Sequence, residues 1–133
     1  MTIAGECVAR IGPGLLVLIG VRPQDDALSA EHLLERVLKY RVFSDAAGKM
    51  NLDLAQAGGE LLLVPQFTLA ADTKKGLRPG FSTAAPPEQG KRLYEHLVGL
   101  ARSRLGNVGS GVFGANMAVS LVNDGPVTLW LES

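Results

Sequence analysis

Cysteine and histidine are scarce in this sequence, with one cysteine and two histidines among 133 residues. A single cysteine, Cys7, excludes an intramolecular disulfide. Neither His32 nor His96 belongs to a zinc-binding pattern such as His-x₃-His, so we expect no metal. A serine-hydrolase triad needs a histidine oriented by a carboxylate, and both histidines fall inside expected helices, where they fit the helix surface better.

Cofactor-binding and membrane-spanning segments are also missing. The sequence has no P-loop, no dinucleotide fingerprint and no Gly-x-Ser-x-Gly elbow, so we expect no cofactor. The longest apolar runs, residues 15–19 and 61–65, are far too short to cross a bilayer, and no signal peptide is visible. We therefore expect a soluble cytoplasmic protein without a membrane partner.

Net charge is absent as well, since 13 basic and 13 acidic residues balance at pH 7. A protein that holds nucleic acid by nonspecific phosphate contacts is usually basic. The balance therefore argues against a general nucleic-acid binder. The balance is still compatible with a protein that binds a few nucleotides through a local basic patch.

What the sequence does contain is enough apolar residues for one core. Hydrophobic residues make up 47% of the chain, which fits a single domain over residues 1–133. Two segments have the apolar spacing of helices. The first is opened by Asp25-Asp26-Ala27 and should end within residues 40–42, and the second is opened by Pro86-Pro87-Glu88.

Strands are expected around these helices. Residues 6–11 and 15–21 flank a Gly-Pro-Gly turn and predict a hairpin, whose second strand should be central and covered on both faces. Further strands are expected at residues 60–69, at Phe113, at 117–122 and at 127–131, whereas Gly109-Ser110-Gly111 is interpreted as a turn. The order ββ-α-β-α-β-β predicts an α/β fold with mixed β-sheets and two helices, arranged as a layered ββα sandwich.

The segment Gln66-Phe67-Thr68-Leu69 falls where an expected strand runs into a long loop, residues 70–85. Backbone N–H groups at a strand end are free of the ladder and can form an oxyanion hole for an ester carbonyl. The Thr68 hydroxyl could bind substrate or attack it. The alternative is structural, with Phe67 in the core and Gln66 and Thr68 as polar strand residues.

Two further features can contribute to a site. Asn123-Asp124-Gly125-Pro126 is a β-turn in the simplest interpretation, but a cis Gly125-Pro126 bond would point two successive carbonyls the same way, toward an ammonium group. Lys74, Lys75 and Arg78 follow the first segment closely, and a basic cluster there can contact phosphate instead of only solvent.

Together these segments resemble the D-aminoacyl-tRNA deacylase family, also called D-tyrosyl-tRNA deacylases. The resemblance extends through nearly the whole chain. It is carried, in order, by residues 11–17, 43–45 with 48–51, 66–69 with 72–76, 84–87 with 93–94, 113–115 and 119–128. Six short matches in the same order are far more specific than any one of them.

The resemblance implies a homodimeric hydrolase that proofreads chirality on the 3′ end of aminoacyl-tRNA. The amides of Phe67 and Thr68 would bind the ester carbonyl, and Gln66 and Met117 would contact substrate. Gly125-Pro126 of the partner subunit would enter the pocket, hold the α-amino group and leave no room for an L side chain. Glycine mischarged on tRNA-Ala would not be rejected. The 2′-hydroxyl of the RNA can help activate water, so no catalytic side chain is needed, although Thr68 as nucleophile remains an alternative.

Two departures from the family pattern affect these expectations. Pro65 stands where the family usually has serine, which removes a hydroxyl and a backbone N–H. The family also usually has an extra strand upstream of Val8, and without it a sheet edge is left open. A non-catalytic, dimeric tRNA- or adenosine-binding module of the same fold therefore stays open as an alternative, as does a threonine-dependent esterase acting on small esters.

Overall fold

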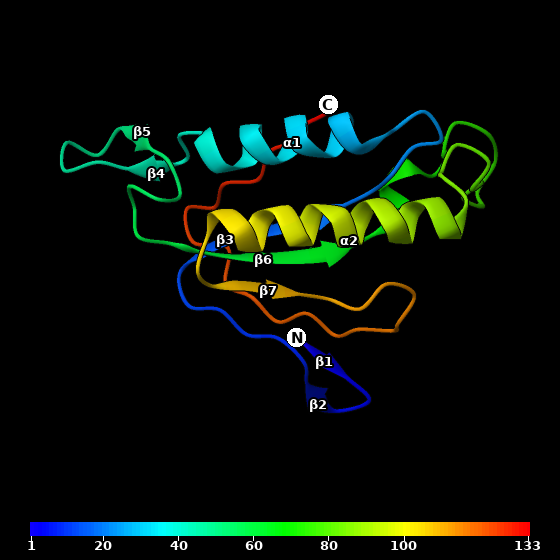
Figure 1. Cartoon of the computed structure of the whole chain (residues 1–133), viewed down its shortest axis with the longest axis horizontal. Coiled ribbons are helices and arrows are strands. Elements are labelled where there is room, and N and C mark those ends of the chain that lie inside the picture. Colours follow the sequence, from blue (N-terminus) through cyan, green and yellow to red (C-terminus); the bar gives the residue numbers. More distant parts are fainter.

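Two α-helices form where the sequence predicts them in a computed structural model that describes all 133 residues (Figure 1). Helix α1 spans Ala27–Lys39, and Asp26 caps it because its carboxylate accepts a hydrogen bond from the Ser29 N–H at 2.9 Å. Helix α2 spans Pro87–Arg104, with proline in the first turn, where a missing N–H costs nothing. Both predicted helix starts and the predicted end of α1 are confirmed.

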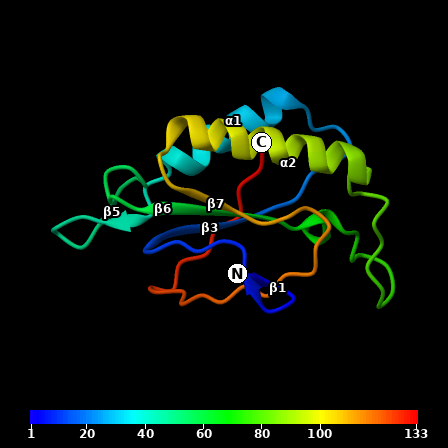
Figure 2. The ribbon, with the colours of Figure 1, turned by 60° about the horizontal axis from the view of Figure 1, so that its bottom comes forward.

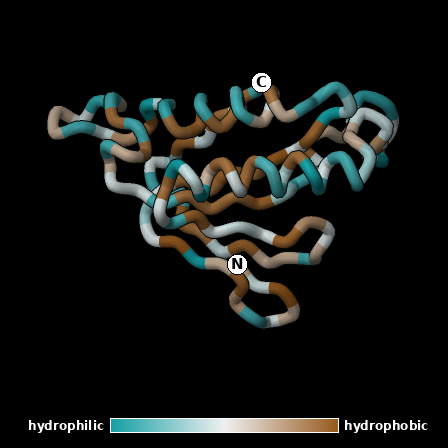
Figure 3. The backbone as a smooth tube through the Cα atoms, in the orientation of Figure 1, coloured by the Kyte–Doolittle hydropathy of each residue, from teal (hydrophilic) through white to brown (hydrophobic).

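The hydrophobic core lies between the two helices and one sheet. Each helix turns an apolar stripe inward, which Figure 3 shows as brown segments that alternate with hydrophilic ones. The buried side chains of the stripes are Leu34, Val37 and Leu38 from α1 and Leu93, Tyr94, Leu97, Val98 and Ala101 from α2. They pack with Leu61 and Leu63 of the sheet in one cluster.

The sheet has three parallel strands in the order β3-β6-β7, and both helices cover the same face (Figure 2). Strand β3 spans Gly14–Ile19, β6 spans Glu60–Pro65 and β7 spans Val108–Ser110. Residues 61–65 of β6 are all buried, as expected for the central strand. The fold is thus mixed α/β with two helices, as predicted.

The prediction that residues 15–21 form a central strand of a hairpin is wrong. Strand β3 lies at the edge of the sheet and pairs only with β6, in parallel. The preceding residues pair elsewhere, because β1 (Thr2–Ile3) and β2 (Glu6–Cys7) form their own antiparallel hairpin. A groove of about 1300 Å³ runs along β3, between this strand and residues 120–133, so the apolar strand is only half-buried.

Other predicted strands also differ from the structure. The strand expected at 60–69 ends at Pro65, and Gly109-Ser110, interpreted as a turn, belongs to β7. The predicted second sheet of the layered sandwich is not formed, because there is no strand at residue 113, 117–122 or 127–131. One antiparallel bridge, Thr2 to Ala118, is made there. Strand-like sequence alone is insufficient, because a strand requires a neighbour for its N–H and C=O groups.

A small hairpin completes the secondary structure. Strands β4 (Phe43–Ser44) and β5 (Met50–Leu52) pair antiparallel around a turn, where the Asp45 carboxylate accepts three hydrogen bonds, from the Ala47 and Lys49 N–H groups and the Asn51 amide. These bonds hold the pKa of the Asp45 carboxyl below its ordinary value. Neither helix is long and apolar enough to span a membrane.

Candidate functional site

The candidate site begins where the central strand leaves the sheet. Pro65 is the last residue of β6, and the Gln66 N–H donates one more hydrogen bond to the Ile19 carbonyl, at 2.7 Å. The chain then turns into a short 3-10 helix, η1, over Phe67–Ala70. Proline suits this place because its missing N–H falls at the end of the ladder. The prediction that the 66–69 segment lies at a strand end is confirmed.

The first two residues of η1 have free backbone donors. Neither the Phe67 N–H nor the Thr68 N–H donates a hydrogen bond to any protein atom, whereas the Leu69 N–H donates to the Gln66 carbonyl at 3.2 Å. Unpaired N–H groups are expected in the first turn of a helix. Both residues are exposed, so these two adjacent donors are accessible to an oxygen of a ligand.

The Thr68 hydroxyl has one hydrogen-bond partner in the structure. It accepts a bond from the Gln66 side-chain amide, Nε2 to Oγ1, at 2.5 Å. No histidine, carboxylate or amine bonds to this hydroxyl. A hydroxyl nucleophile needs a base to take its proton, and an amide donor cannot do so. The bond instead fixes the two side chains beside the free amides.

Gly20, for which the sequence predicts no role, determines how closely η1 packs against the sheet. A Cβ added at Gly20 would lie 2.9 Å from the Leu69 Cβ and 3.3 Å from the Gln66 carbonyl oxygen. Any larger residue would therefore push η1 away from the end of β3. The signal in the sequence was a lone glycine at the end of an apolar run, which indicates a close backbone approach.

Met117 lies near Pro65, the residue that precedes the candidate site. A Cβ added at Gly111 would be 2.9 Å from the Met117 sulfur and 3.0 Å from Cδ of Pro65, so these two side chains meet at Gly111. The structure thus brings Met117 close to the residue that precedes Gln66. Its side chain is half-buried there.

Tyr94 of α2 fixes the two strands that meet below the site. Its buried hydroxyl lies 2.8 Å from the Gly111 carbonyl oxygen and 3.0 Å from the Leu63 carbonyl oxygen. Burial of the phenol raises its pKa to about 12, so the hydroxyl keeps its proton and remains a donor. The sequence gives no sign of this role for the Tyr94 hydroxyl, because its partners come from distant segments.

The predicted turn at residues 123–126 contains the expected cis bond between Gly125 and Pro126. The Asn123 side chain closes this turn, since its oxygen accepts the Val127 N–H at 3.1 Å and its amide donates to the Thr128 hydroxyl at 2.9 Å. Gly125 has φ +141°, and an added Cβ would lie 3.0 Å from Cγ2 of Val127. Glycine is therefore required here.

Within one chain, this turn does not reach η1. The red-orange segment around the turn lies at one end of the molecule and the green η1 segment lies at the other, in both Figure 1 and Figure 2. The structure thus brings Gln66, Phe67 and Thr68 together, places Met117 near the preceding Pro65, and keeps Gly125-Pro126 apart from all of them.

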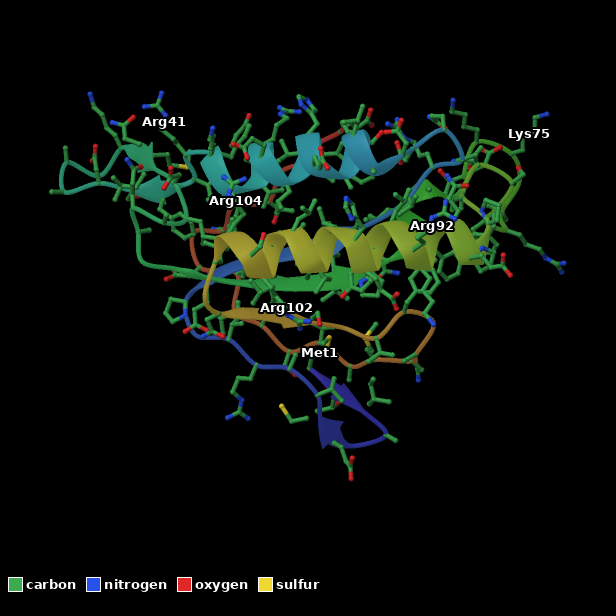
Figure 4. The ribbon with its side chains drawn as sticks, viewed as in Figure 1. Met1, Arg41, Lys75, Arg92, Arg102 and Arg104 are labelled. Atoms are coloured by element: carbon green, nitrogen blue, oxygen red, sulfur yellow. The ribbon has the colours of Figure 1, made fainter.

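The predicted basic cluster lies at the η1 end of the molecule. Asp72 and Gly80 close the loop with two backbone hydrogen bonds of 2.7 and 2.9 Å. Lys74, Lys75 and Arg78 lie on this loop, are exposed and form no ion pair. In Figure 4, Lys75 points outward, and Arg92 marks the start of α2 at the same end. No group of three or more histidine, cysteine or acidic side chains is placed to hold a metal ion.

Comparisons with known proteins agree on one family. A protein-family model described as D-Tyr-tRNA(Tyr) deacylase matches residues 1–132. The D-aminoacyl-tRNA deacylase of Azotobacter vinelandii is 63% identical over 133 residues, which cover 100% of this chain and 92% of the relative. The D-aminoacyl-tRNA deacylase of Pseudomonas fluorescens strain Pf0-1 is 60% identical over 131 residues, covering 98% and 90%.

Solved structures support the same fold. A protein described as c-Myc DNA Unwinding Element Binding Protein superposes with a TM-score of 0.93 at 38% identity, covering 99% of this chain and 90% of that chain. A probable eukaryotic D-amino acid tRNA deacylase superposes with a TM-score of 0.70 over 84% of this chain and 81% of its own. At 18% identity, that second likeness shows the fold alone.

Proposed function

The chain belongs to the D-aminoacyl-tRNA deacylase family and is a hydrolase, and from this premise we propose how its own residues cleave the ester bond of D-aminoacyl-tRNA. The products are free D-amino acid and tRNA, and residues 1–133 act as one domain. Glycine mischarged on tRNA-Ala is a second substrate. The observation that carries the proposal is the pair of unpaired N–H groups on Phe67 and Thr68.

These two amides stabilise the charge that develops during hydrolysis. Water attacks the ester carbonyl carbon, and the carbonyl oxygen becomes an oxyanion that accepts hydrogen bonds from both N–H groups. The C–O bond to the ribose then breaks, and the 3′ oxygen leaves with a proton as the free hydroxyl of tRNA. The neighbouring 2′-hydroxyl of the substrate helps to activate the water, so no side chain of the protein acts as a base.

Thr68 serves in this mechanism through its backbone. Its hydroxyl accepts a bond from the Gln66 amide and has no basic neighbour, which supports a positioning role over nucleophilic attack. Gln66, whose side chain bonds to Thr68, and Met117, which lies near Pro65, are proposed to contact the substrate.

Chiral selection is proposed to come from a second copy of the chain. The turn that holds Gly125-Pro126 lies at the far end from η1, so it completes a site only if the partner subunit supplies it. Carbonyl groups of that turn would hold the α-amino group and exclude an L side chain by their position. Glycine has no side chain to exclude, which explains its inclusion as a substrate.

Release of amino acid from matched D- and L-aminoacyl-tRNA tests the proposal. Purified protein is expected to deacylate D-tyrosyl-tRNA and leave L-tyrosyl-tRNA intact under the same conditions. If the protein binds both aminoacyl-tRNAs but hydrolyses neither, the result would favour the alternative of a non-catalytic binding module. The name of the 38% identical structure, a DNA-binding protein, gives that alternative its support.

A further inference from the structure

The segment that carries Gly125-Pro126 has no hydrogen-bond ladder to hold it. Residues 119–129 form no strand, and the hydrogen bonds that they make close the turn itself, through the Asn123 side chain. The segment lies across the groove from β3 and does not pair with that strand. We call residues 119–133 the strap. Because no ladder fixes the strap, its path depends on the contacts at its two ends.

Both ends of the strap are tied to the fold. Just before it, Thr2 and Ala118 exchange two backbone hydrogen bonds of 2.8 and 2.9 Å. At its other end, Arg36 of α1 donates a hydrogen bond from Nη1 to the Glu132 carbonyl oxygen at 3.0 Å. In Figure 1 the red end of the chain accordingly runs to α1. Gly125 lies midway between these two ties in the sequence, so both ties determine where the turn lies.

Arg36 is the stronger of two arginine contacts with Glu132. Its guanidinium carbon lies 5.9 Å from the centre of the Tyr40 ring, and its side chain is half-buried. Arg22 approaches the Glu132 carboxylate at 3.5 Å and pairs with Asp25 at 3.7 Å. An exposed ion pair of this kind contributes little, whereas a charged donor makes a hydrogen bond roughly twice as strong as a neutral one. Arg36 is therefore the main anchor, and Arg22 supports it.

We propose that Arg36 anchors the strap so that Gly125-Pro126 is positioned to exclude L side chains. This inference rests on the proposed function, in which that turn enters the pocket of the partner subunit. Arg36 acts through the backbone of the strap and is a positioning residue. A displacement of about 1 Å far from the chemistry can cost about 100-fold in rate. A displaced turn would hold the α-amino group less well and would leave room for an L side chain.

The ratio of D- to L-tyrosyl-tRNA deacylation rates tests this role. Arg36→Gln removes the charged donor, and in single-turnover reactions it is expected to lower the ratio by about 10- to 100-fold. The rate on L-tyrosyl-tRNA should rise, because the free amides of Phe67 and Thr68 are unchanged while the turn has moved. A variant that had only lost stability would be slower on both substrates by the same factor, which leaves the ratio unchanged.

Two variants serve as controls. Arg104→Gln removes another helix arginine, which binds Glu35 at 2.6 Å and makes no hydrogen bond or ion pair with the strap. It should keep the wild-type ratio. Arg36→Lys keeps a charged donor on a long side chain and should retain most of the ratio.

Trp130 reports on the strap without any substrate. It is the sole tryptophan of the chain, it is 65% exposed, and its Nε1 donates a hydrogen bond to Glu132 Oε1 at 2.9 Å. Time-resolved fluorescence anisotropy detects motion of the indole on the nanosecond timescale. The amplitude of this motion should be larger in Arg36→Gln than in the wild type, and Arg104→Gln should match the wild type.

Three outcomes would overturn the anchoring role: an unchanged ratio in Arg36→Gln, unchanged motion of Trp130, or an equal fall of the ratio in Arg104→Gln. D-specific hydrolysis by both the wild type and Arg36→Gln would uphold the proposed function and refute the role of Arg36. A wild type that hydrolyses neither substrate, or both equally, would refute the proposed function and with it the chiral role. The anisotropy would then still decide whether Arg36 holds the strap.

Discussion

Replacing Phe67 by proline removes one of the two proposed oxyanion donors without removing a hydrogen bond that the free protein makes. The Phe67 N–H has no partner in the structure, and Phe67 is the first residue of η1, where proline is tolerated. The preceding Gln66 has φ −142° and ψ 81°, outside the helical region that proline disfavours before itself. The backbone is therefore expected to keep its course.

Phe67→Ala is the matched control, because it loses the same ring and keeps the N–H. The loss of one oxyanion donor typically costs about 10²–10³ in rate, or about 2.7–4 kcal/mol of transition-state stabilisation. Single-turnover deacylation of D-tyrosyl-tRNA at saturating enzyme should therefore be about 100-fold or more slower in Phe67→Pro than in Phe67→Ala. Both variants should unfold at similar temperatures, since the ring is half-exposed.

Equal rates in the two variants would refute the reasoning, because the N–H is their functional difference. Circular dichroism measures the unfolding temperature of both variants. If Phe67→Pro unfolds at a much lower temperature than Phe67→Ala, a slower rate would not support the oxyanion role of this N–H. In that case Thr68 and Gln66 would have moved with the backbone, and the rate could not be assigned to one donor.

The remaining predictions concern the hydroxyl, the packing and the pH dependence. Thr68→Ala should slow single-turnover deacylation by no more than about tenfold, the cost of one hydrogen bond, whereas complete loss would indicate a nucleophile. Tyr94→Phe should lower the free energy of unfolding in urea by about 1–2 kcal/mol, because the buried Gly111 carbonyl oxygen loses its donor, whereas the Leu63 carbonyl oxygen keeps the Gly111 N–H; no change would contradict that role. Hydrogen bonding to Arg104 lowers the pKa of Glu35 to about 2 from its ordinary 4.5, so its stabilising contribution is complete above pH 4.5 and is lost as pH falls toward 2. The free energy of unfolding of Glu35→Gln should therefore fall less than that of the wild type between pH 4.5 and 2. An equal fall in both proteins would contradict the lowered pKa of Glu35.

The features that the sequence predicted correctly are those determined by neighbouring residues. The Asp26 cap, the proline at the start of α2 and the apolar stripes all act within a few residues of one another. The change from strand to loop near residues 66–69 is local as well, although the strand ends at Pro65 and not at residue 69. The position of the candidate site followed from these signals, because it lies at a strand end next to a loop.

The features that failed depend on residues far apart in the chain. Whether β3 is central or at an edge depends on which segment lies beside it, and its all-apolar sequence is equally compatible with both. Residues 117–122 have strand-like sequence but lack a ladder partner. Gly109 was taken for a turn because glycine is common there, but in β7 its missing side chain makes room for Leu62, 2.9 Å from an added Cβ.

Contacts between residues far apart in the chain were also missed within the site. The sequence gives no sign that Arg36 holds the strap, because its contact with the Glu132 carbonyl joins residues 96 positions apart. Gly20 and Tyr94 act on η1 and on β6 through contacts that are likewise distant in sequence. Composition and spacing could indicate the segment that carries chemistry, and only the packing identified the residues that hold it.

Activity of mixed subunits tests most directly whether main-chain groups of two chains form one site. Phe67→Pro impairs the amides, and Gly125→Ala impairs the turn because φ there is +141°. Gly48→Ala, at φ +79° in another turn, is the control and should stay active. When the two impaired chains are co-expressed and pair at random, half of the dimers carry one intact site, so about one quarter of wild-type deacylase activity should return. Activity no higher than that of either variant alone would contradict a site shared between subunits.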